Sequence, residues 1–128
     1  MATYLPSRSR STGETGAELA RLNPHLRLPT GLISRVTGVE RVHVRPEGWQ
    51  ASDLAIAAAK NLLAAHPASP DLLIFAAASQ DLVEPATAHI VSAGLGLRTP
   101  DGLGVPVMDI KNACNSVLNA LQVADALI

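Results

Sequence analysis

Apolar residues recur at intervals of three and four in the middle of the chain, a spacing that places their side chains on one face of a helix. The positions are Leu54, Ala55, Ala58, Ala59, Leu62 and Leu63. Ser52 and Asp53 are residue types that cap helices, and Pro67 and Pro70 cannot continue one. We therefore expect a helix from residue 52 to about residue 65.

Two continuous apolar runs, at residues 71–78 and 105–110, have the length of β-strands. Unbroken apolar strands are typical of parallel sheets, whose two faces are both covered. A polar connection leads from the first run into a helix from about Pro85 to Ala93, because proline is favoured in the first turn of a helix. Gly94 and Gly96 are expected to end that helix.

The first 45 residues have a weaker pattern. Residues 1–11 suggest a strand remnant that leads into a loop. Thr12 or Thr15 can cap a short helix through Leu22, which Asn23 and Pro24 end because the residue before a proline is disfavoured in a helix. Residues 26–45 are less regular, although the valines at positions 39, 42 and 44 predict a short extended segment.

The last apolar pattern begins at Cys114. The residues three, four, seven and fourteen positions further on are Val117, Leu118, Leu121 and Ile128, which form one stripe of a helix. A second, polar stripe consists of Asn115, Asn119 and Gln122. The succession of helix, strand, helix, strand and helix predicts an α/β layered fold with a largely parallel sheet.

Composition narrows the possible functions. The 128 residues suggest one domain. With 10 basic and 11 acidic residues, the chain has no excess of positive charge with which to bind nucleic acid. A single cysteine excludes an intrachain disulfide and a cysteine-cluster metal site. No signal-peptide pattern occurs, and no apolar run reaches the roughly 18 residues of a membrane span. We expect a cytoplasmic protein that binds neither nucleic acid nor membrane.

Cys114 is the strongest candidate for chemistry. If residues 105–110 form a strand and a helix begins near Cys114, the thiol lies beside the free N–H groups and the positive end of the helix dipole. Such a position stabilises a thiolate, the form that attacks carbonyl carbon. The alternative is that Cys114 is a small core residue, since unpaired cysteines are among the most often buried residue types.

Other polar residues give weaker signals. The four histidines have no metal-ligand spacing, and we expect them to be structural or exposed: His25, His43, His66 and His89. Asp109 and Lys111 flank the strand that leads to Cys114. In an alternating strand they suit a layer boundary or an interface as well as they suit a catalytic site.

Six short segments together carry a family resemblance. They are Tyr4-Leu5-Pro6, Thr37-Gly38-Val39, Ser52-Asp53-Leu54-Ala55, Glu84-Pro85-Ala86-Thr87-Ala88, Leu95-Gly96 and Asp109-Ile110-Lys111-Asn112-Ala113-Cys114. In this order, the chain resembles the N-terminal half of the thiolase superfamily, specifically the β-ketoacyl synthase III group. That group includes acyl-CoA-condensing enzymes of olefin biosynthesis. The resemblance implies a mostly parallel sheet flanked by helices.

The resemblance also implies a reaction. Cys114 would accept an acyl group from coenzyme A or acyl carrier protein, with its own backbone N–H as one oxyanion donor. The acyl-enzyme would then undergo Claisen condensation with a second thioester, often a malonyl one, in fatty acid, polyketide or olefin-type biosynthesis. No cofactor or metal is expected. The expected assembly is a homodimer or heterodimer through the thiolase-type interface.

Glu84 matches the olefin-type enzymes, in which a glutamate before this proline acts as a base in the partner subunit's site. The alternative is a solvated loop carboxylate that the helix dipole favours. Asn115-Ser116-Val117 departs from the small-Gly-Phe run that is more usual after the family's cysteine. This departure bears on the shape of the acyl pocket.

Members of this family are considerably longer and consist of two similar halves. The second half supplies a histidine, with an asparagine or second histidine, that activates the condensing partner. We therefore expect residues 1–128 to be an incomplete N-terminal half-domain that does not complete a condensation alone. Two alternatives stay open: a non-catalytic half-domain that pairs with another thiolase-like chain, and an unrelated α/β binding module.

Overall fold

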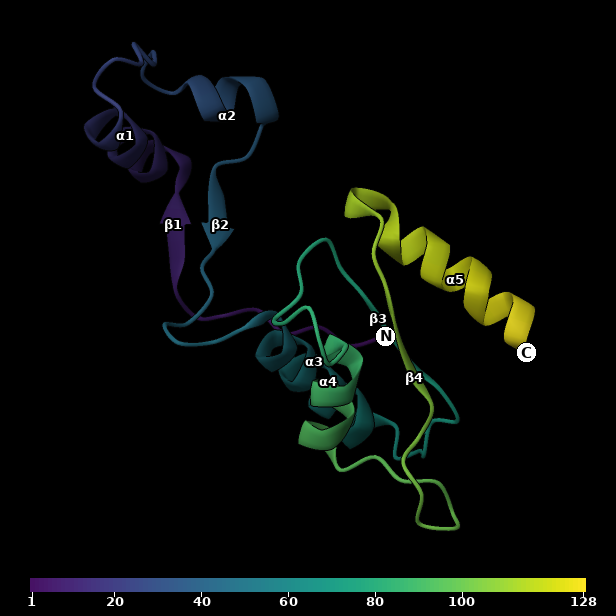
Figure 1. The fold of residues 1–128 in the computed structure, drawn as a ribbon. Coiled ribbons are helices and arrows are strands. Elements are labelled where there is room, and N and C mark those ends of the chain that lie inside the picture. The colour runs from purple at the N-terminus through teal and green to yellow at the C-terminus, as the bar shows by residue number, and fades with distance from the viewer. The chain divides into compact units, whose positions relative to one another are not determined.

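The computed structural model describes residues 1–128, which divide into two compact units (Figure 1). One unit consists of residues 5–47. The other consists of residues 1–4 together with residues 48–128. The sequence predicts one domain and does not indicate a division into two units.

The unit of residues 5–47 is a two-stranded ribbon that carries two helices. Its elements are β1 (Ser9–Ser11), α1 (Thr12–Leu22), α2 (Leu32–Thr37) and β2 (Arg41–His43). The two strands are antiparallel, and Arg10 pairs with Val42. The extended segment expected around the valines is confirmed as β2. The six-residue α2 was not predicted; it lies between Gly31 and Gly38, which have φ angles of 70° and 69°.

Helix α1 has the predicted end at Leu22 but a different cap. Ser11 is still extended, with φ −74° and ψ 155°, and its Oγ accepts a hydrogen bond from the Glu14 N–H at 3.1 Å. The Glu14 carboxylate accepts the Ser11 N–H at 2.6 Å, which completes a capping box. The prediction of Thr12 or Thr15 as the cap was therefore wrong, because both lie inside the helix.

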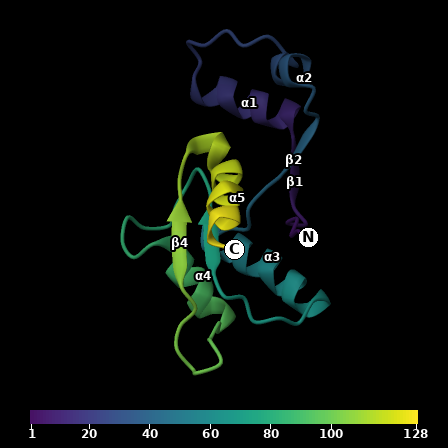
Figure 2. The same ribbon diagram turned by 90° about the vertical axis from the view of Figure 1, so that its right-hand side faces the viewer.

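The larger unit contains the predicted α/β arrangement. Its elements are α3 (Ala51–Ala65), β3 (Leu73–Ala76), α4 (Thr87–Leu95), β4 (Val107–Ile110), a 3₁₀ turn (Ala113–Asn115) and α5 (Ser116–Leu127). Strands β3 and β4 are parallel, with Leu73 opposite Val107 and Ala76 opposite Ile110. In Figure 1, α3 and α4 lie on one side of this strand pair and α5 on the other, and Figure 2 views the pair from the α5 side.

The N-terminal residues belong to this larger unit. The Tyr4 ring stacks on Trp49 with a centroid distance of 5.6 Å, and Asn61 Nδ2 donates a hydrogen bond to Thr3 O at 2.9 Å. The core of the unit includes Ala88, Val91, Leu97 and Val105, all buried. As the composition suggests, small aliphatic side chains fill it.

Two helix starts differ from the predictions. The cap of α3 is Gln50, whose N–H donates to the Asp53 carboxylate at 2.7 Å, so Ser52 and Asp53 lie in the first turn. Helix α4 begins at Thr87, so Pro85 precedes the helix. Proline lacks an N–H and disfavours a helical conformation in the residue before it. A proline near the start of a helix therefore predicts the first helical residue only approximately.

The two glycines near the end of α4 have different roles. Gly96, with φ 65°, is the left-handed residue that ends the helix. Gly94 lies inside the helix, where a Cβ would come within 2.5 Å of Ile56 Cδ1 of α3. The prediction that both glycines end α4 was wrong for Gly94, which instead permits close packing between α3 and α4.

Helix α5 keeps its predicted apolar stripe, but the stripe is exposed. Val117, Leu118 and Leu121 are 57%, 61% and 61% exposed. Helix α5 itself lies on the side of the strand pair opposite α4 (Figure 1). None of the helices combines the length and the hydropathy that crossing a bilayer requires.

Candidate active site

Cys114 lies in the 3₁₀ turn between β4 and α5, as the sequence predicts, and its side chain is exposed. As the second residue of the turn, it places its N–H among the amides for which a helix start supplies no partner. Ala113, directly before it, has a φ of 44° and is the one non-glycine residue of the chain with a positive φ. The thiol is thus accessible and follows an unusual backbone conformation.

The hydroxyl of Ser116 holds this turn together. Ser116 is only 2% exposed, and its Oγ accepts the Asn112 N–H at 2.8 Å. The same hydroxyl has one proton to donate, and two carbonyl oxygens are within reach of it. They are Ala113 O at 2.8 Å and Ala77 O at 3.3 Å. Ala77 directly follows β3, so Ser116 connects the Cys114 turn to the end of the neighbouring strand.

Polar side chains continue along α5 from this turn. Asn112 Nδ2 donates to Asn119 Oδ1 at 2.7 Å, and Asn119 Nδ2 donates to Gln122 Oε1 at 3.2 Å. Two residues of the predicted polar stripe, Asn119 and Gln122, therefore belong to a chain of side-chain hydrogen bonds, whereas the third, Asn115, is replaced in it by Asn112. The first of these hydrogen bonds links Asn112, in the segment between β4 and α5, to Asn119 of helix α5.

Glu84 lies in the loop between β3 and α4. Its side chain is exposed and makes no hydrogen bond or ion pair. The two preceding residues, Leu82 and Val83, are 52% and 86% exposed. This loop therefore presents two apolar side chains and a carboxylate to its surroundings.

The N-terminus of α4 is occupied by a different carboxylate, that of Asp109. Its Oδ2 accepts the Thr87 N–H and its Oδ1 accepts the Ala88 N–H, each at 2.8 Å. Glu84 is thus not the cap of this helix, and its exposure is compatible with both interpretations, a solvated loop carboxylate and a base for a partner subunit. Asp109 instead fixes the start of α4 to β4.

Two further contacts join the loops at this end of the strands. Asp81 accepts the Ser52 N–H at 3.2 Å, and the Asp81 N–H donates to Thr87 Oγ1 at 3.3 Å. Lys111 Nζ donates to Gln80 Oε1 at 3.2 Å. Since β3 and β4 are parallel, the loops that carry Glu84 and Cys114 leave the same edge of the sheet.

The structure thus ties together the two segments that carry the candidate residues, although no hydrogen bond links Cys114 to Glu84 themselves. The roles of Asp109 and Ser116 were not foreseen. For Asp109, the signal was a carboxylate inside an apolar strand, which requires hydrogen-bond partners when it is half-buried. Ser116 gave no signal beyond its departure from the family pattern.

The histidines do not gather at this site. His25, His43, His66 and His89 are all exposed, and His43 Nδ1 lies 2.6 Å from Pro6 O. No group of three or more histidine, cysteine or acidic side chains could hold a metal ion. These positions agree with the expectation that the histidines are structural or exposed.

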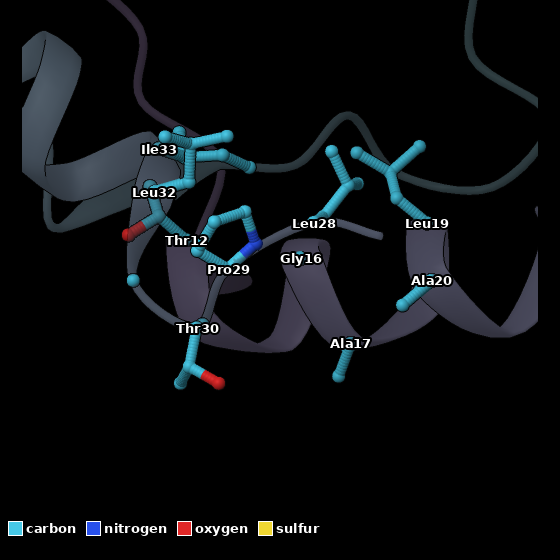
Figure 3. Close-up of a pocket in the computed structure, with 12 residues that line it drawn as sticks. Thr12, Gly16, Ala17, Leu19, Ala20, Leu28, Pro29, Thr30, Leu32 and Ile33 are labelled. Carbon is cyan, nitrogen blue, oxygen red and sulfur yellow. The ribbon is translucent and has the colours of Figure 1, made fainter. Parts of the chain in front are cut away.

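Each unit also has a mainly apolar groove. In residues 5–47, a cavity of about 280 Å³ lies between α1 and the segment that ends in α2, and Leu19, Leu28 and Ile33 line it (Figure 3). In the larger unit, a groove of about 510 Å³ lies between β3 and α5, lined by residues that include Ile74 and Leu121. Neither groove contains a candidate catalytic residue.

Comparisons with known sequences give a consistent result. No protein-family model matches the chain. The β-ketoacyl-[acyl-carrier-protein] synthase III of Rhodospirillum rubrum is 38% identical over 129 residues, which covers 98% of this chain and 36% of the relative. The enzyme of the same name from Bordetella petrii is 34% identical and is covered to 37%. The chain therefore spans little more than a third of the length of these curated relatives.

Solved structures lead to the same group. The 3-oxoacyl-(acyl carrier protein) synthase III of Xanthomonas oryzae matches with a TM-score of 0.83 at 27% identity, over 98% of this chain and 37% of that protein. OleA of Xanthomonas campestris matches with a TM-score of 0.82 at 28% identity, with the same two coverages. The resemblance to the β-ketoacyl synthase III group and the α/β fold class predicted from the sequence are both confirmed.

Proposed function

Because the chain is similar over almost its whole length to one part of the β-ketoacyl synthase III enzymes, we propose that it is the N-terminal portion of a condensing enzyme of this type. Residues 1–128 would be an incomplete half-domain, and the remaining catalytic groups would come from a second half. The observation that carries the proposal is the exposed thiol of Cys114 at a strand-to-helix turn of this fold.

In the proposed reaction, the Cys114 thiolate attacks the carbonyl carbon of an acyl thioester. The tetrahedral oxyanion is stabilised by backbone N–H groups at the start of the helix, including that of Cys114. The carrier thiolate of coenzyme A or acyl carrier protein leaves, and the acyl group stays on Cys114. A second thioester becomes a carbanion when a malonyl group loses CO2 or when a base removes an α-proton. This carbanion attacks the acyl group on Cys114, which forms a carbon–carbon bond and releases the Cys114 thiolate.

Glu84 would serve the site of a partner subunit. Its carboxylate is exposed, and two exposed apolar side chains precede it in the same loop. Such a loop is suited to insertion into a neighbouring subunit, because burial of the apolar residues would favour contact while the carboxylate reaches a reacting group. There it would act as a base toward the second thioester. The proposed assembly is a dimer in the cytoplasm.

The exposed stripe of α5 also favours association. It adjoins the groove between β3 and α5, and it begins one helical turn after Cys114. Covering this face with further α/β structure would bury apolar area and enclose the start of the helix. The same face would suit a non-catalytic half-domain that pairs with another chain, which is the second candidate function.

The first half-reaction can be tested by exchange of the carrier. An acyl group that passes through Cys114 allows isotopically labelled coenzyme A to enter unlabelled acyl-CoA when no second substrate is present. We expect exchange with the chain above the rate of spontaneous thiol exchange, and the spontaneous rate alone with Cys114→Ala. Equal exchange with both proteins would favour the non-catalytic pairing role.

Glu84 needs a separate test, in a dimeric preparation that forms condensation product. Glu84→Gln is expected to lower product formation while acyl loading of Cys114 persists, because the base acts after loading. Mixing Glu84→Gln subunits with Cys114→Ala subunits should restore product, since one mixed site would contain both groups. Mixed dimers as inactive as either parent would exclude a role across the interface.

A further inference from the structure

The backbone before Cys114 is held in a conformation that side-chain-bearing residues rarely adopt. Ala113 has a φ of 44°, which brings its Cβ close to the backbone, whereas glycine would adopt the same angle without this cost. Such residues persist only where their surroundings fix them. At this turn the fixing contacts can be identified.

Ser116 supplies contacts on both sides of Ala113. Its hydroxyl accepts the Asn112 N–H at 2.8 Å and lies 2.8 Å from Ala113 O. Its backbone N–H also donates to Ala113 O. Because Ser116 is 2% exposed and reaches Ala77 O at 3.3 Å, water cannot readily replace the hydroxyl. These contacts fix the Lys111–Asn112 and Ala113–Cys114 peptide groups, one on each side of the short segment that contains Ala113.

We propose that Ser116 is a positioning residue for Cys114: its buried hydroxyl stabilises the left-handed conformation of Ala113 and thereby holds the thiol at the N-terminus of α5. The inference rests on the proposed role of Cys114 as the acyl acceptor. Ser116 does not touch the substrate in this scheme. It acts through the backbone, by keeping the sulfur where the helix terminus favours negative charge.

The effect of Ser116 on the position of the Cys114 thiol can be measured with the chain of residues 1–128 alone. An anionic alkylating reagent, iodoacetate, and a neutral one of similar size, iodoacetamide, react with the same single thiol. The ratio of their rate constants reports the electrostatic environment of Cys114. A positive helix terminus raises this ratio, and displacement of the thiol from the terminus lowers it.

Ser116→Ala is expected to lower the ratio by about threefold, the size of a helix-terminus effect at an exposed site. Ser92→Ala is the control, because Ser92 is also buried and helical but lies in α4. It should leave the ratio unchanged. Both variants are compared under conditions in which circular dichroism shows that they are folded, so that a loss of stability alone does not alter the ratio.

Rescue provides a second readout. Ala113→Gly, added to Ser116→Ala, should restore most of the ratio, because glycine adopts a positive φ without the contacts of Ser116. If Ser116→Ala does not fold, Ser116→Thr and Ser116→Val decide the question. These two side chains have the same shape, and only threonine retains the hydroxyl, so the ratio should be higher for threonine.

A wild-type ratio in folded Ser116→Ala, or equal ratios in the threonine and valine variants, would overturn the positioning role. These outcomes are distinct from failure of the proposed function. If wild-type Cys114 accepts no acyl group from acyl-CoA, the acyl-acceptor assignment fails, while the alkylation ratio still decides whether Ser116 positions the thiol.

Discussion

Ala113 and Cys114 show how an unfavourable residue conformation can be maintained beside a reactive group. A left-handed conformation costs a residue with a Cβ roughly 1–2 kcal/mol. The hydrogen bonds of the buried Ser116 hydroxyl, each with a net value of about 1 kcal/mol, are sufficient to offset this cost. The result is an exposed thiol on a well-defined turn.

Glu14 gives a residue-level prediction for the unit of residues 5–47. The hydrogen bond from the Ser11 backbone N–H, and then that from the Ser11 hydroxyl, hold the pKa of the Glu14 carboxyl below its usual 4.5. A pKa that is lower in the folded state gives stability that is complete above the unfolded-state pKa and is lost as the pH falls through the folded-state pKa. We therefore expect Glu14→Gln to flatten the loss of stability on acidification below about pH 4.5.

Thermal unfolding measured at a series of acidic pH values checks this prediction. Ser11→Ala serves for comparison, because it removes the hydroxyl donor but keeps the backbone N–H, the larger cause of the shift. Its acid dependence should lie between those of the wild type and Glu14→Gln. An acid dependence in Glu14→Gln identical to that of the wild type would contradict the role of the capping box.

Helix α4 is held to β4 by one carboxylate. Asp109 accepts the N–H groups of Thr87 and Ala88, and both of these residues are fully buried. Without the carboxylate, neither N–H has a hydrogen-bond acceptor. The contact is therefore more costly to lose than an ordinary exposed helix cap.

Asp109→Ala is expected to lower the free energy of unfolding by about 2 kcal/mol, because it leaves two buried N–H groups unsatisfied. Asp125→Ala, in the exposed part of α5, is the control and should change it by less than about 0.5 kcal/mol. Denaturant titration measures both values. Equal midpoints for the two variants would show that Asp109 does not anchor α4.

The elements differ in how well the sequence predicts them. Helix α3 and strands β3 and β4 follow from their periodicity and apolar runs, and the turn at Cys114 follows from the change of pattern there. Helix α2 could not be predicted in this way, because it has only six residues. The strand remnant expected within residues 1–11 could not be placed at Ser9–Ser11, because β1 is short and forms by pairing with the distant β2. The role of Asp109 likewise arises only when the folded backbone brings its carboxylate to the N–H groups of α4. Ser11 is different, because Ser11 and Glu14 have the local spacing of a capping box, which the prediction of Thr12 or Thr15 as the cap overlooked.

In the larger unit as a whole, the contacts within the unit do not account for the exposed apolar face of α5. Val117, Leu118 and Leu121 are each more than half exposed, although their spacing is that of a buried stripe. The sequence predicts the stripe but cannot specify what covers it. Since the matched relatives are more than twice as long as this chain, we propose that further structure of the same enzyme covers this face.

Leu121→Glu tests this face. Because Leu121 is 61% exposed, we expect the substitution to change the free energy of unfolding by less than about 0.5 kcal/mol. When the structure that would cover this face is lacking, the exposed apolar side chains are expected to bind a second copy of the chain. The substitution should therefore weaken self-association of the isolated chain, which sedimentation velocity measures over a range of concentrations. Leu22→Glu, at a similarly exposed leucine of α1, is the control. Equal concentration dependence in the wild type and Leu121→Glu would contradict an associating role for α5.

The most direct test of the central claim is the intact mass of the chain after incubation with a panel of acyl-CoAs. We expect a mass increase of one acyl group in the wild type and none in Cys114→Ala, since Cys114 is the only cysteine. The best-loaded acyl chain would indicate the substrate class. An equal adduct on Cys114→Ala, or no adduct on folded wild-type protein even when a downstream half is supplied, would contradict Cys114 as the acyl acceptor.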